Sequence, residues 1–451
     1  MTNEYLEGNF APVTDEVTLT DLPVTGTIPT ELTGRYLRNG PNPVTPPDPD
    51  AYHWFVGDGM VHGLRLDEGR ASWYRNRWVR SAVVADALGE PHHPGPVHAD
   101  MDFGPNTNVI GHAGKVLAIV EAGSRPYELT DELDTVGPTD LGGTLQGGYT
   151  AHPKRDPRTG ELHAMSYYWG WGNEVEYTVI DTSGSVSHSR MIETTGSPMV
   201  HDMSLTERFA VVYDLPVTFD LEDAMAGKRM PYTWKADYPA RLGLVPRPDS
   251  DLAGGDVRWF EVDPCYVFHP MNAYEDGDDV VLDVVHWTRM FDPGHHGPFG
   301  ATMPSLRRWT IDTVGGKVRE ELHDDHDQEF PRVDERVVGR HHRYGYSAIN
   351  LPGSGSGPRH GGILKVDVES GTTEVLDLGA GAAQNEAVFV PRSADAAEDD
   401  GWLLCLTYSS ESDTSRLDIH HAQDLQGGPV ATVQLPRRVP FGFHGNWLPD
   451  A

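Results

Sequence analysis

Four histidines in this chain share a setting in which a metal site could be built. Each ends a short stretch with apolar or aromatic residues, and each is followed by a residue that turns the chain: His152, His201, His269 and His444. The neutral imidazole is the commonest metal ligand in proteins, so four of them could hold one transition-metal ion. Taken singly, each could instead be a core histidine bonded to a backbone carbonyl. The residues alone leave both interpretations open.

The spacing of these histidines requires a fold that converges on one point. They follow one another at intervals of 49, 68 and 175 residues, so no local metal motif such as HExxH is present. The inner strands of a β-propeller converge on a central axis, where side chains from separate blades can reach one atom. A propeller would therefore assemble such a site naturally.

Hairpin sequences recur from the middle of the chain to its end. A short alternating strand, a turn containing Asp and Gly, and a second strand are found in 176–192, 308–322 and 363–378. The 49 glycines and 35 prolines also suit many short strands joined by turns. We predict an all-β fold. The hairpins favour a propeller, although a β-sandwich would contain the same hairpins.

The irregular stretches between strands indicate loops of a single domain. Those rich in His, Pro and Gly are short and are soon followed by strand-like sequence; they cover 41–49, 91–96, 292–304 and 351–362. We therefore expect residues 1–451 to form one domain. The stretch 393–400, with alanines and acids after its first residue, is the segment that we predict to be disordered.

Charge and composition exclude several classes of partner. The net charge of −33 argues against nucleic acid and against tight docking to an anionic membrane, since both would repel the surface. Cys265 and Cys405 are too few for a disulfide framework and form no CxxC pair. The N-terminus has acids where a signal peptide needs bases, and no segment is apolar enough to span a bilayer. We expect a soluble protein of the reducing cytoplasm.

The other histidines include four adjacent pairs. These lie in polar or Pro/Gly-rich surroundings, at 92–93, 295–296, 341–342 and 420–421. We predict that they are surface or loop residues and not ligands.

Four sequence strings, of which the last three are long and unusual, identify a resemblance. They are Gly-Asn-Phe-Ala-Pro-Val at 8–13, Gly-Arg-Tyr-Leu-Arg-Asn-Gly-Pro-Asn-Pro at 34–43, His-Trp-Phe-Val-Gly-Asp-Gly-Met-Val-His at 53–62, and Phe-Gly-Phe-His-Gly-Asn-Trp at 441–447. With them the chain resembles the carotenoid oxygenase family, also called carotenoid cleavage dioxygenases, over nearly its full length. The resemblance implies a seven-bladed β-propeller with long loops and short helices capping the active-site face. It also implies one iron(II) per chain, held by the same four histidines.

The resemblance further implies that three glutamates hold three of the ligands. The matching pairs are Glu121 with His201, Glu329 with His269, and Glu386 with His444. His152 is left without an acid. A carboxylate that accepts the proton of the second ring nitrogen fixes the tautomer and raises the basicity of a ligand histidine. Without the resemblance, Glu329 could be an exposed loop residue bridging to Arg332.

The predicted reaction needs iron(II) and O2 but no organic cofactor. Four neutral ligands leave the full positive charge on the metal and two adjacent open positions in octahedral geometry. No GxGxxG follows a strand, so no nicotinamide or flavin site is evident. Thr107 resembles the family residue whose methyl group crowds one open position and steers oxygen to the other. An ordinary strand threonine after a Pro-Asn turn is the alternative.

The expected substrate is a small hydrophobic alkene. The resemblance implies that O2 splits a C=C double bond of a carotenoid or apocarotenoid into two carbonyl products. Stilbene-cleaving members place a lysine directly before the glutamate that matches Glu121, and here that position is Val120. An apolar side chain favours a nonphenolic polyene, with stilbene or phenylpropenoid cleavage as the alternative. We expect Phe55, Phe291 and Val120 to line the substrate site, although the aromatic residues could equally be core packing.

Two other functions remain open from the sequence. One is a non-redox isomerase or hydrolase that uses the same iron site, and the other is a propeller that only binds. The bond that is cleaved, the physiological pathway and the oligomeric state are not fixed by the sequence. An apolar patch at the mouth of a substrate tunnel would permit weak peripheral contact with a membrane.

Overall fold

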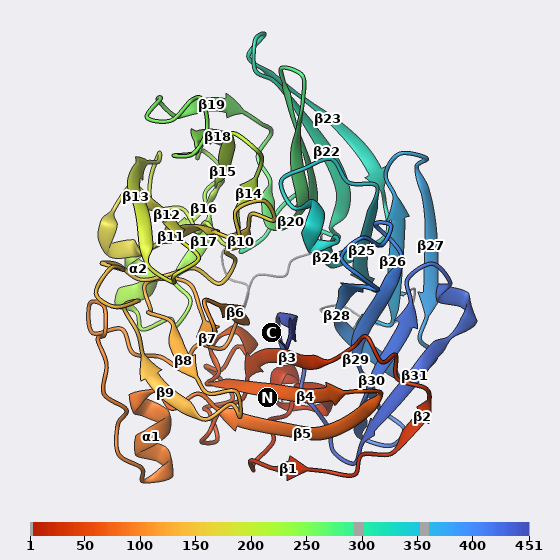
Figure 1. The fold of residues 1–451 in the computed structure, drawn as a ribbon. Coiled ribbons are helices and arrows are strands. Elements are labelled where there is room, and N and C mark those ends of the chain that lie inside the picture. Colours follow the sequence, from red (N-terminus) through yellow and green to blue (C-terminus); the bar gives the residue numbers. More distant parts are fainter. Residues whose placement is uncertain (1–2, 293–301, 352–359, 451) are drawn as a thin grey trace.

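The strands of the protein form a ring of seven sheets. The computed structural model describes residues 3–292, 302–351 and 360–450. Within these ranges, seven sheets of four or five strands surround a common centre, with an additional two-stranded ribbon of β16 (Val217–Phe219) and β17 (Tyr232–Trp234) (Figure 1). The predicted all-β class and the seven-bladed propeller are confirmed.

The two ends of the chain close the ring. The first sheet holds β1 (Thr18–Leu19), β5 (Arg70–Trp78), β4 (Gly59–Asp67), β3 (Gly34–Pro41) and the C-terminal strand β32 (Gly445–Pro449). The last sheet holds β28 (Ala382–Pro391), β29 (Gly401–Ser409), β30 (Thr414–His421), β31 (Pro429–Leu435) and the N-terminal strand β2 (Val24–Gly26). Strands from both termini thus bind the first and last blades together.

The other five blades follow one another along the chain. They are β6 (Asn108–His112), β7 (Lys115–Ile119), β8 (Tyr127–Leu129) and β9 (Thr135–Pro138); β10 (Lys154–Arg155), β11 (Leu162–Tyr167), β12 (Glu174–Ile180) and β13 (Val186–Glu193); β14 (Ser204–Leu205), β15 (Phe209–Asp214), β18 (Arg241–Pro246) and β19 (Arg258–Glu261); β20 (Tyr266–Asp276), β21 (Asp279–Trp287), β22 (Ser305–Asp312) and β23 (Lys317–Asp324); and β24 (Gln328–Arg332), β25 (Tyr344–Ile349), β26 (Gly362–Asp367) and β27 (Thr372–Asp377). The three predicted hairpins are confirmed as β12–β13, β22–β23 and β26–β27.

Burial explains the sequence patterns of inner and outer strands. In β21 every residue after the first is buried, because both faces of a middle strand pack against neighbouring blades. Its Val-Val-Leu-Asp-Val-Val run therefore shows no polar alternation. In the outer strand β13, exposed and partly buried residues alternate almost throughout, as expected for a strand with one face in water.

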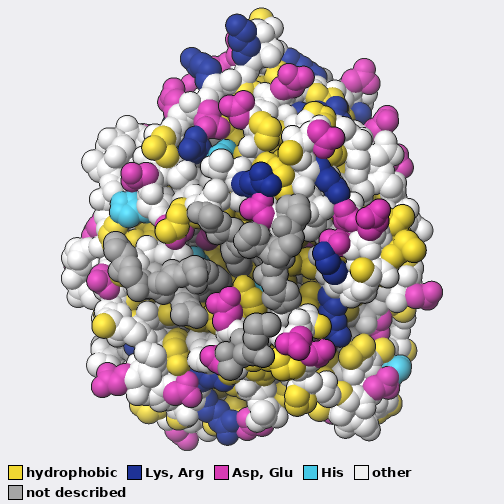
Figure 2. Space-filling view, turned by 180° about the vertical axis from the view of Figure 1, so that it is seen from behind, with side chains coloured by type: hydrophobic (Ala, Val, Ile, Leu, Met, Phe, Trp, Pro, Cys, Tyr) yellow, Lys and Arg dark blue, Asp and Glu magenta, His cyan; other side chains and the backbone are white. Residues whose placement is uncertain are grey.

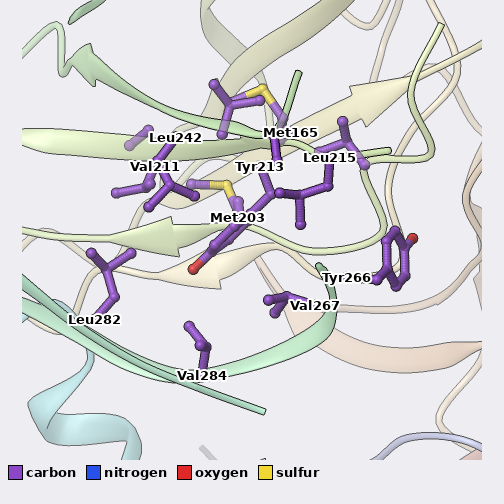
Figure 3. Close-up of a cluster of buried hydrophobic side chains, with 14 of the residues drawn as sticks. Met165, Met203, Val211, Tyr213, Leu215, Leu242, Tyr266, Val267, Leu282 and Val284 are labelled. Atoms are coloured by element: carbon purple, nitrogen blue, oxygen red, sulfur yellow. The ribbon is translucent and has the colours of Figure 1, made fainter. Parts of the chain in front are cut away.

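Apolar side chains fill the wedges between blades. Figure 3 shows one such wedge, where side chains from β11, β15, β18, β20 and β21 and from the segments beside them meet. Its labelled members are Met165, Met203, Val211, Tyr213, Leu215, Leu242, Tyr266, Val267, Leu282 and Val284. Each is at most 3% exposed, so the blades are held in fixed orientation around the axis.

Helices are few and short in the described part of the chain. The α-helices are α1 (Ala82–Leu88) and α2 (Leu221–Met225). The 3-10 helices are η1 (Glu4–Leu6), η2 (Gly8–Phe10), η3 (Trp54–Val56), η4 (Trp169–Trp171), η5 (Glu335–Val337) and η6 (Leu425–Gly427). None of these has the length and apolar character needed to cross a bilayer.

The segment 393–400 is ordered, so the prediction of disorder was wrong. The Arg336 guanidinium donates hydrogen bonds to the carbonyl oxygens of Ser393 and Ala394 at 3.1 and 2.8 Å. Lys365 Nζ lies 2.8 Å from Asp399 Oδ2. Glu398 accepts from the backbone N–H groups of Arg343 and Tyr344 at 2.7 Å, so groups of the neighbouring blade hold the segment in place.

Two histidines of the adjacent pairs are buried, and the prediction of surface or loop positions was wrong for one of them, His420. His342 is fully buried, with Nε2 3.4 Å from Asp283 Oδ2, and His420 is 2% exposed within β30. The side chains of His92 and His341 are 55% and 56% exposed, as predicted. The pair at 295–296 lies outside the described residues. The polar residues that neighbour these histidines in the sequence did not reveal which of the histidines are buried.

Candidate metal centre

The four predicted histidines meet at the axis of the propeller. His152, His201 and His444 lie just before β10, β14 and β32, and His269 lies within β20. These are the innermost strands of four different blades. One ring nitrogen from each histidine lies within 4.8 Å of the other three, and all four side chains are buried. Residues up to 292 positions apart in sequence are thus brought to one point.

Irregular backbone aims side chains at this centre. The strand registers shift around His269 in β20, between Glu329 and Arg332 in β24, and between Gln384 and Ala387 in β28. Such bulges redirect side chains that a regular pleat would alternate between the two faces. Phe330, beside Glu329, has φ of 53°, a left-handed conformation that is costly for a bulky residue and is often retained at functional sites.

Three glutamates contact the histidines with which they were paired in the sequence. Both oxygens of Glu121 lie 2.9 Å from His201 Nδ1. The corresponding distances are 2.6 Å from Glu329 Oε2 to His269 Nδ1 and 3.1 Å from Glu386 Oε1 to His444 Nδ1. A carboxylate accepts from Nδ1–H, so Nε2 of each ring carries a lone pair that faces the centre.

Glu329 and Glu386 remain ionised although they are buried. Burial alone would raise the pKa of Glu386, but Arg332, His444 and the Gly445 N–H lower it to about 2. Burial also opposes ionisation of Glu329, yet His269, Trp287 and a backbone N–H hold the pKa of its carboxyl below the usual value. Anionic carboxylates are therefore available to hold the ligand rings.

His152 differs from the other three histidines. Its Nδ1 lies 3.7 Å from Asp202 Oδ2, which is too long for a direct hydrogen bond. That carboxylate is held instead by Lys154 Nζ at 2.8 Å. Burial, with the neighbouring histidines, holds the pKa of His152 well below its usual range, so the ring is neutral.

The arrangement of nitrogens fits a bound cation. His152 Nε2 is buried and has no hydrogen-bond partner in residues 3–292, 302–351 and 360–450. His201 Nε2 and His269 Nε2 face each other at 3.2 Å, although both glutamates hold the ring protons on Nδ1. Facing lone pairs repel unless a cation lies between them. Metal–imidazole bonds of roughly 2.1 Å place ligand nitrogens at most about 4.2 Å apart, which is close to the observed spread. The donor set of neutral imidazoles suits iron, zinc, copper or nickel.

An apolar cavity of about 570 Å³ opens onto the histidines. It is lined by His201, His269 and His444 and by a set of mainly apolar side chains that includes Trp54, Val120, Met199, Tyr232, Phe268 and Phe443. Phe103 and Met303 line it while remaining 37% and 67% exposed, so they mark its mouth. Figure 2 shows the molecule from behind, and hydrophobic side chains are interspersed among acidic and basic ones on the face that this view presents. The volume and lining are those of a site for a hydrophobic small molecule.

A second cavity, of about 700 Å³, also reaches the histidines. Its lining mixes charged and apolar side chains and is more polar than that of the first cavity, so we call it the polar cavity. It is lined by His152, His269 and His444 and by charged side chains that include Arg35, Lys154, Arg155, Asp202, Arg332 and Glu335. The histidine centre therefore borders two spaces of different character.

The remaining predicted site residues are distributed unequally around the apolar cavity. Thr107, Val120 and Phe55 line it. Thr107 Oγ1 donates to Asn106 Oδ1 at 2.9 Å, and the Thr107 carbonyl accepts from the His444 backbone N–H at 3.1 Å. Phe291 is not among the lining residues; it is 3% exposed, and its ring packs 6.0 Å from that of Phe268.

Several residues around the centre were not singled out from the sequence. The Phe330 ring stacks on His269 at 5.3 Å and contacts His444 at 5.2 Å. Trp287 Nε1 donates to Glu329 Oε1 at 2.7 Å, and Arg332 Nη1 lies 3.1 Å from Glu386 Oε1. The string Glu-Phe-Pro-Arg contained two of them, but Arg332 binds Glu386 and not Glu329.

Comparison with known proteins supports the relationship indicated by the site. Residues 10–449 match the retinal pigment epithelial membrane protein family. The chain is 49% identical to a carotenoid cleavage oxygenase of Mycobacterium tuberculosis over 99% of its length and 98% of that protein. It is 31% identical to an isoeugenol monooxygenase of Pseudomonas nitroreducens, with 98% of each chain covered.

Solved structures show the same fold. A lignostilbene dioxygenase of Pseudomonas brassicacearum superposes with a TM-score of 0.89 at 28% identity, with 100% of each chain covered. A cobalt-substituted apocarotenoid oxygenase of Synechocystis gives a TM-score of 0.87 at 29% identity, with 97% of each chain covered. These relatives confirm that the chain is an enzyme of the carotenoid-cleavage type. The chain therefore belongs to the retinal pigment epithelial membrane protein family, as its resemblance to the carotenoid oxygenases predicted.

Proposed function

We propose that the protein is a non-haem iron(II) dioxygenase that splits a C=C double bond of a carotenoid or apocarotenoid with O2. One alkene and one O2 give two carbonyl groups, so the reaction needs no external reductant and no net proton. The observation that carries the proposal is the convergence of four buried histidine nitrogens, three of them on rings held by glutamates, beside an apolar cavity.

His152, His201, His269 and His444 would hold the iron through Nε2. When bound there, iron(II) supplies the electrons and the open coordination positions that activation of O2 requires. Glu121, Glu329 and Glu386 keep three ligand rings in one tautomer and orientation. These carboxylates are occupied by the histidines and do not need to transfer a proton to substrate.

The cavity side chains would position the alkene and exclude water. Phe55, Phe268 and Phe443 form a connected aromatic cluster, with ring centroids 6.1 Å apart for Phe55–Phe268 and 5.4 Å for Phe55–Phe443. The Thr107 hydroxyl is bonded to Asn106, which supports a steric role for this residue beside the metal and not an acid role. The partly exposed Phe103 and Met303 at the mouth suit uptake of a lipid-soluble molecule.

Val120 supports a polyene over a phenolic stilbene. It is 7% exposed, lines the cavity and directly precedes Glu121. A neighbouring ammonium group, which would help to ionise a phenol, is absent at this position. Cleavage of a stilbene or phenylpropenoid is the second candidate, because relatives named for lignostilbene and isoeugenol cover nearly the full chain.

The experiment is product analysis under ¹⁸O₂. Purified protein loaded with iron(II) is incubated with carotenoids, apocarotenals, hydroxystilbenes and isoeugenol, and the products are identified by mass spectrometry. We expect two carbonyl products from a polyene, each with one labelled oxygen, before exchange with water. The variant His269→Ala should lose both iron and cleavage. Products without label would support a non-redox isomerase or hydrolase, and wild-type protein that takes up no stoichiometric iron would refute the proposal.

A further inference from the structure

Three polar residues of one blade line the apolar cavity together. Asp327 directly precedes β24, Asn350 directly follows β25, and His360 lies two residues before β26. The three strands are neighbours in one blade, and Ile349 of β25 pairs with both Gln328 and Gly362. The three polar residues therefore lie at the same end of adjacent strands, and all three line the cavity.

His360 has an imidazole ring with unused hydrogen-bonding capacity. Its side chain is 2% exposed, and neither ring nitrogen has a partner among the residues that the structure describes. Its backbone is fixed, since the His360 carbonyl accepts from the Gln384 N–H at 2.8 Å. The ring meets Phe330 edge-on at 5.7 Å, and Phe330 in turn stacks on His269. His360 thus lies one aromatic ring beyond the metal centre.

Asn350 and Asp327 place acceptors at the same end of the cavity. Asn350 Nδ2 donates to Asp327 Oδ2 at 2.9 Å, which fixes the orientation of the amide. Asn350 Oδ1 is buried and has no partner within the described part of the chain. The subsite thus offers a carbonyl oxygen and a carboxylate as acceptors, and a neutral imidazole that donates from one nitrogen and accepts at the other.

A buried histidine without partners does not by itself indicate a site. His420 is equally buried, and both its ring nitrogens also lack partners, yet it is not among the residues lining either cavity at the metal centre. His360 differs because it lines the cavity together with a second unpartnered polar group, Asn350 Oδ1. A buried polar group without a hydrogen-bond partner is destabilising, and a ligand that pairs with it restores the missing hydrogen bond.

We propose that Asp327, Asn350 and His360 form a subsite for a hydroxyl group at the end of the substrate remote from the cleaved bond. This inference rests on the proposed function for the identity of the substrate. A hydroxyl group donates to Asn350 or Asp327 and accepts from the imidazole N–H. A carbonyl group can only accept, and a hydrocarbon end pairs with none of the three. The subsite therefore selects hydroxylated polyene ends over carbonyl ends, and carbonyl ends over hydrocarbon ends.

The test uses a matched pair of apocarotenals, one with a ring hydroxyl group and one without. Dissociation constants are measured without oxygen on the iron-loaded full chain, by quenching of tryptophan fluorescence, and kcat/KM is then measured in air. We expect the wild type to bind the hydroxylated member about tenfold more tightly, as one additional hydrogen bond would give. In His360→Phe the two members should bind almost equally, and in Asn350→Ala the preference should fall. The control His420→Phe should retain the full preference.

The outcomes separate this inference from the proposed function. Equal binding of both members by the wild type, or an unchanged preference in His360→Phe, would overturn the hydroxyl subsite even if both compounds are cleaved. A hydroxyl preference that depends on His360, in protein that cleaves neither compound, would support the subsite and refute polyene cleavage. If His360→Phe does not fold, the wild-type ratio and the Asn350→Ala ratio still decide.

Discussion

The two cavities at the metal centre share His269, His444 and Phe330 and differ in almost everything else. The apolar cavity is bounded mainly by aromatic and aliphatic side chains, whereas arginine, lysine and carboxylate side chains form a larger part of the lining of the polar cavity. A hydrophobic alkene gains free energy only in the apolar cavity, because charged groups in the polar cavity would lose solvation beside it. The difference therefore supports the proposed binding of an alkene on the apolar side.

Basic side chains that line the polar cavity bind carboxylates beside the metal-site histidines. Arg332 contacts Glu386, and Lys154 contacts Asp202, the residue after His201. Both cations therefore act on groups next to the ligands. We expect substitutions on the polar side to change stability and metal binding, and substitutions on the apolar side to change substrate selection.

The largest expected effect comes from breaking the Arg332–Glu386 pair. Arg332→Met would leave the fully buried Glu386 charge without its cation, which costs about 3–5 kcal/mol of unfolding free energy. Iron content should fall as well, since Glu386 orients His444. Urea unfolding and metal analysis of the purified variant measure both effects.

Arg437→Met is the matched control for Arg332→Met. Arg437 pairs with Asp15, and the two side chains are 45% and 48% exposed, so the loss should be below about 1 kcal/mol. Equal losses in the two variants would show that the Arg332 pair does not support the metal centre.

A second prediction compares the histidines whose Nδ1 is bound by a glutamate with His152, which has no such glutamate. Glu329→Gln removes the charge that holds His269 Nδ1 at 2.6 Å, and iron affinity should fall by about 10–100-fold. Asp202→Asn changes a carboxylate 3.7 Å from His152 Nδ1 and should lower the affinity much less. Iron titration of both variants measures the difference. A larger loss in Asp202→Asn would show that His152 depends on its acid as the others do.

A third prediction concerns substrate selection on the apolar side. Val120→Lys places an ammonium group in the cavity beside Glu121. We expect kcat/KM for a polyene to fall by about tenfold, since an apolar contact is replaced by a charge that must remain solvated. Cleavage of a 4-hydroxystilbene should rise, and its 4-methoxy analogue serves as the control. An unchanged ratio of polyene to stilbene cleavage would remove Val120 from substrate selection.

Local sequence predicted the strands well and the metal residues in part. The hairpins β12–β13, β22–β23 and β26–β27 were predictable because alternation and Asp/Gly turns are local signals. The four histidines could be selected by their context, but only the family resemblance assigned them to one metal. The sequence does not show the closure of the ring by β2 and β32, which brings His444 beside histidines encoded far earlier in the chain.

Contacts between blades explain what the sequence could not predict. Arg336 binds the carbonyls of Ser393 and Ala394 from 57 and 58 residues away, so the segment is ordered by groups that its own composition does not reveal. His342 and Phe291 are also buried, by contacts that their own neighbours in the sequence do not reveal. His360 was not singled out, because its place in the cavity depends on how β26 is aligned beside β24 and β25.

The smallest predicted effect is a pH dependence on the polar side. His112, which lines the polar cavity, donates from Nε2 to the Asp181 carbonyl at 2.7 Å and accepts at Nδ1 from Arg155 at 3.2 Å. Burial and the Arg155 cation lower the pKa of His112 in the folded protein. As pH falls below about 6.5, the unfolded chain takes up a proton that the folded protein does not. The stability that His112 contributes at neutral pH is therefore lost on acidification, by up to about 1 kcal/mol between pH 7 and 5.5.

Urea unfolding at both pH values should show a smaller decrease in unfolding free energy for His112→Gln than for the wild type. The exposed His92→Gln should behave as the wild type, and equal decreases in all three proteins would show that the polar cavity is not a source of this pH sensitivity.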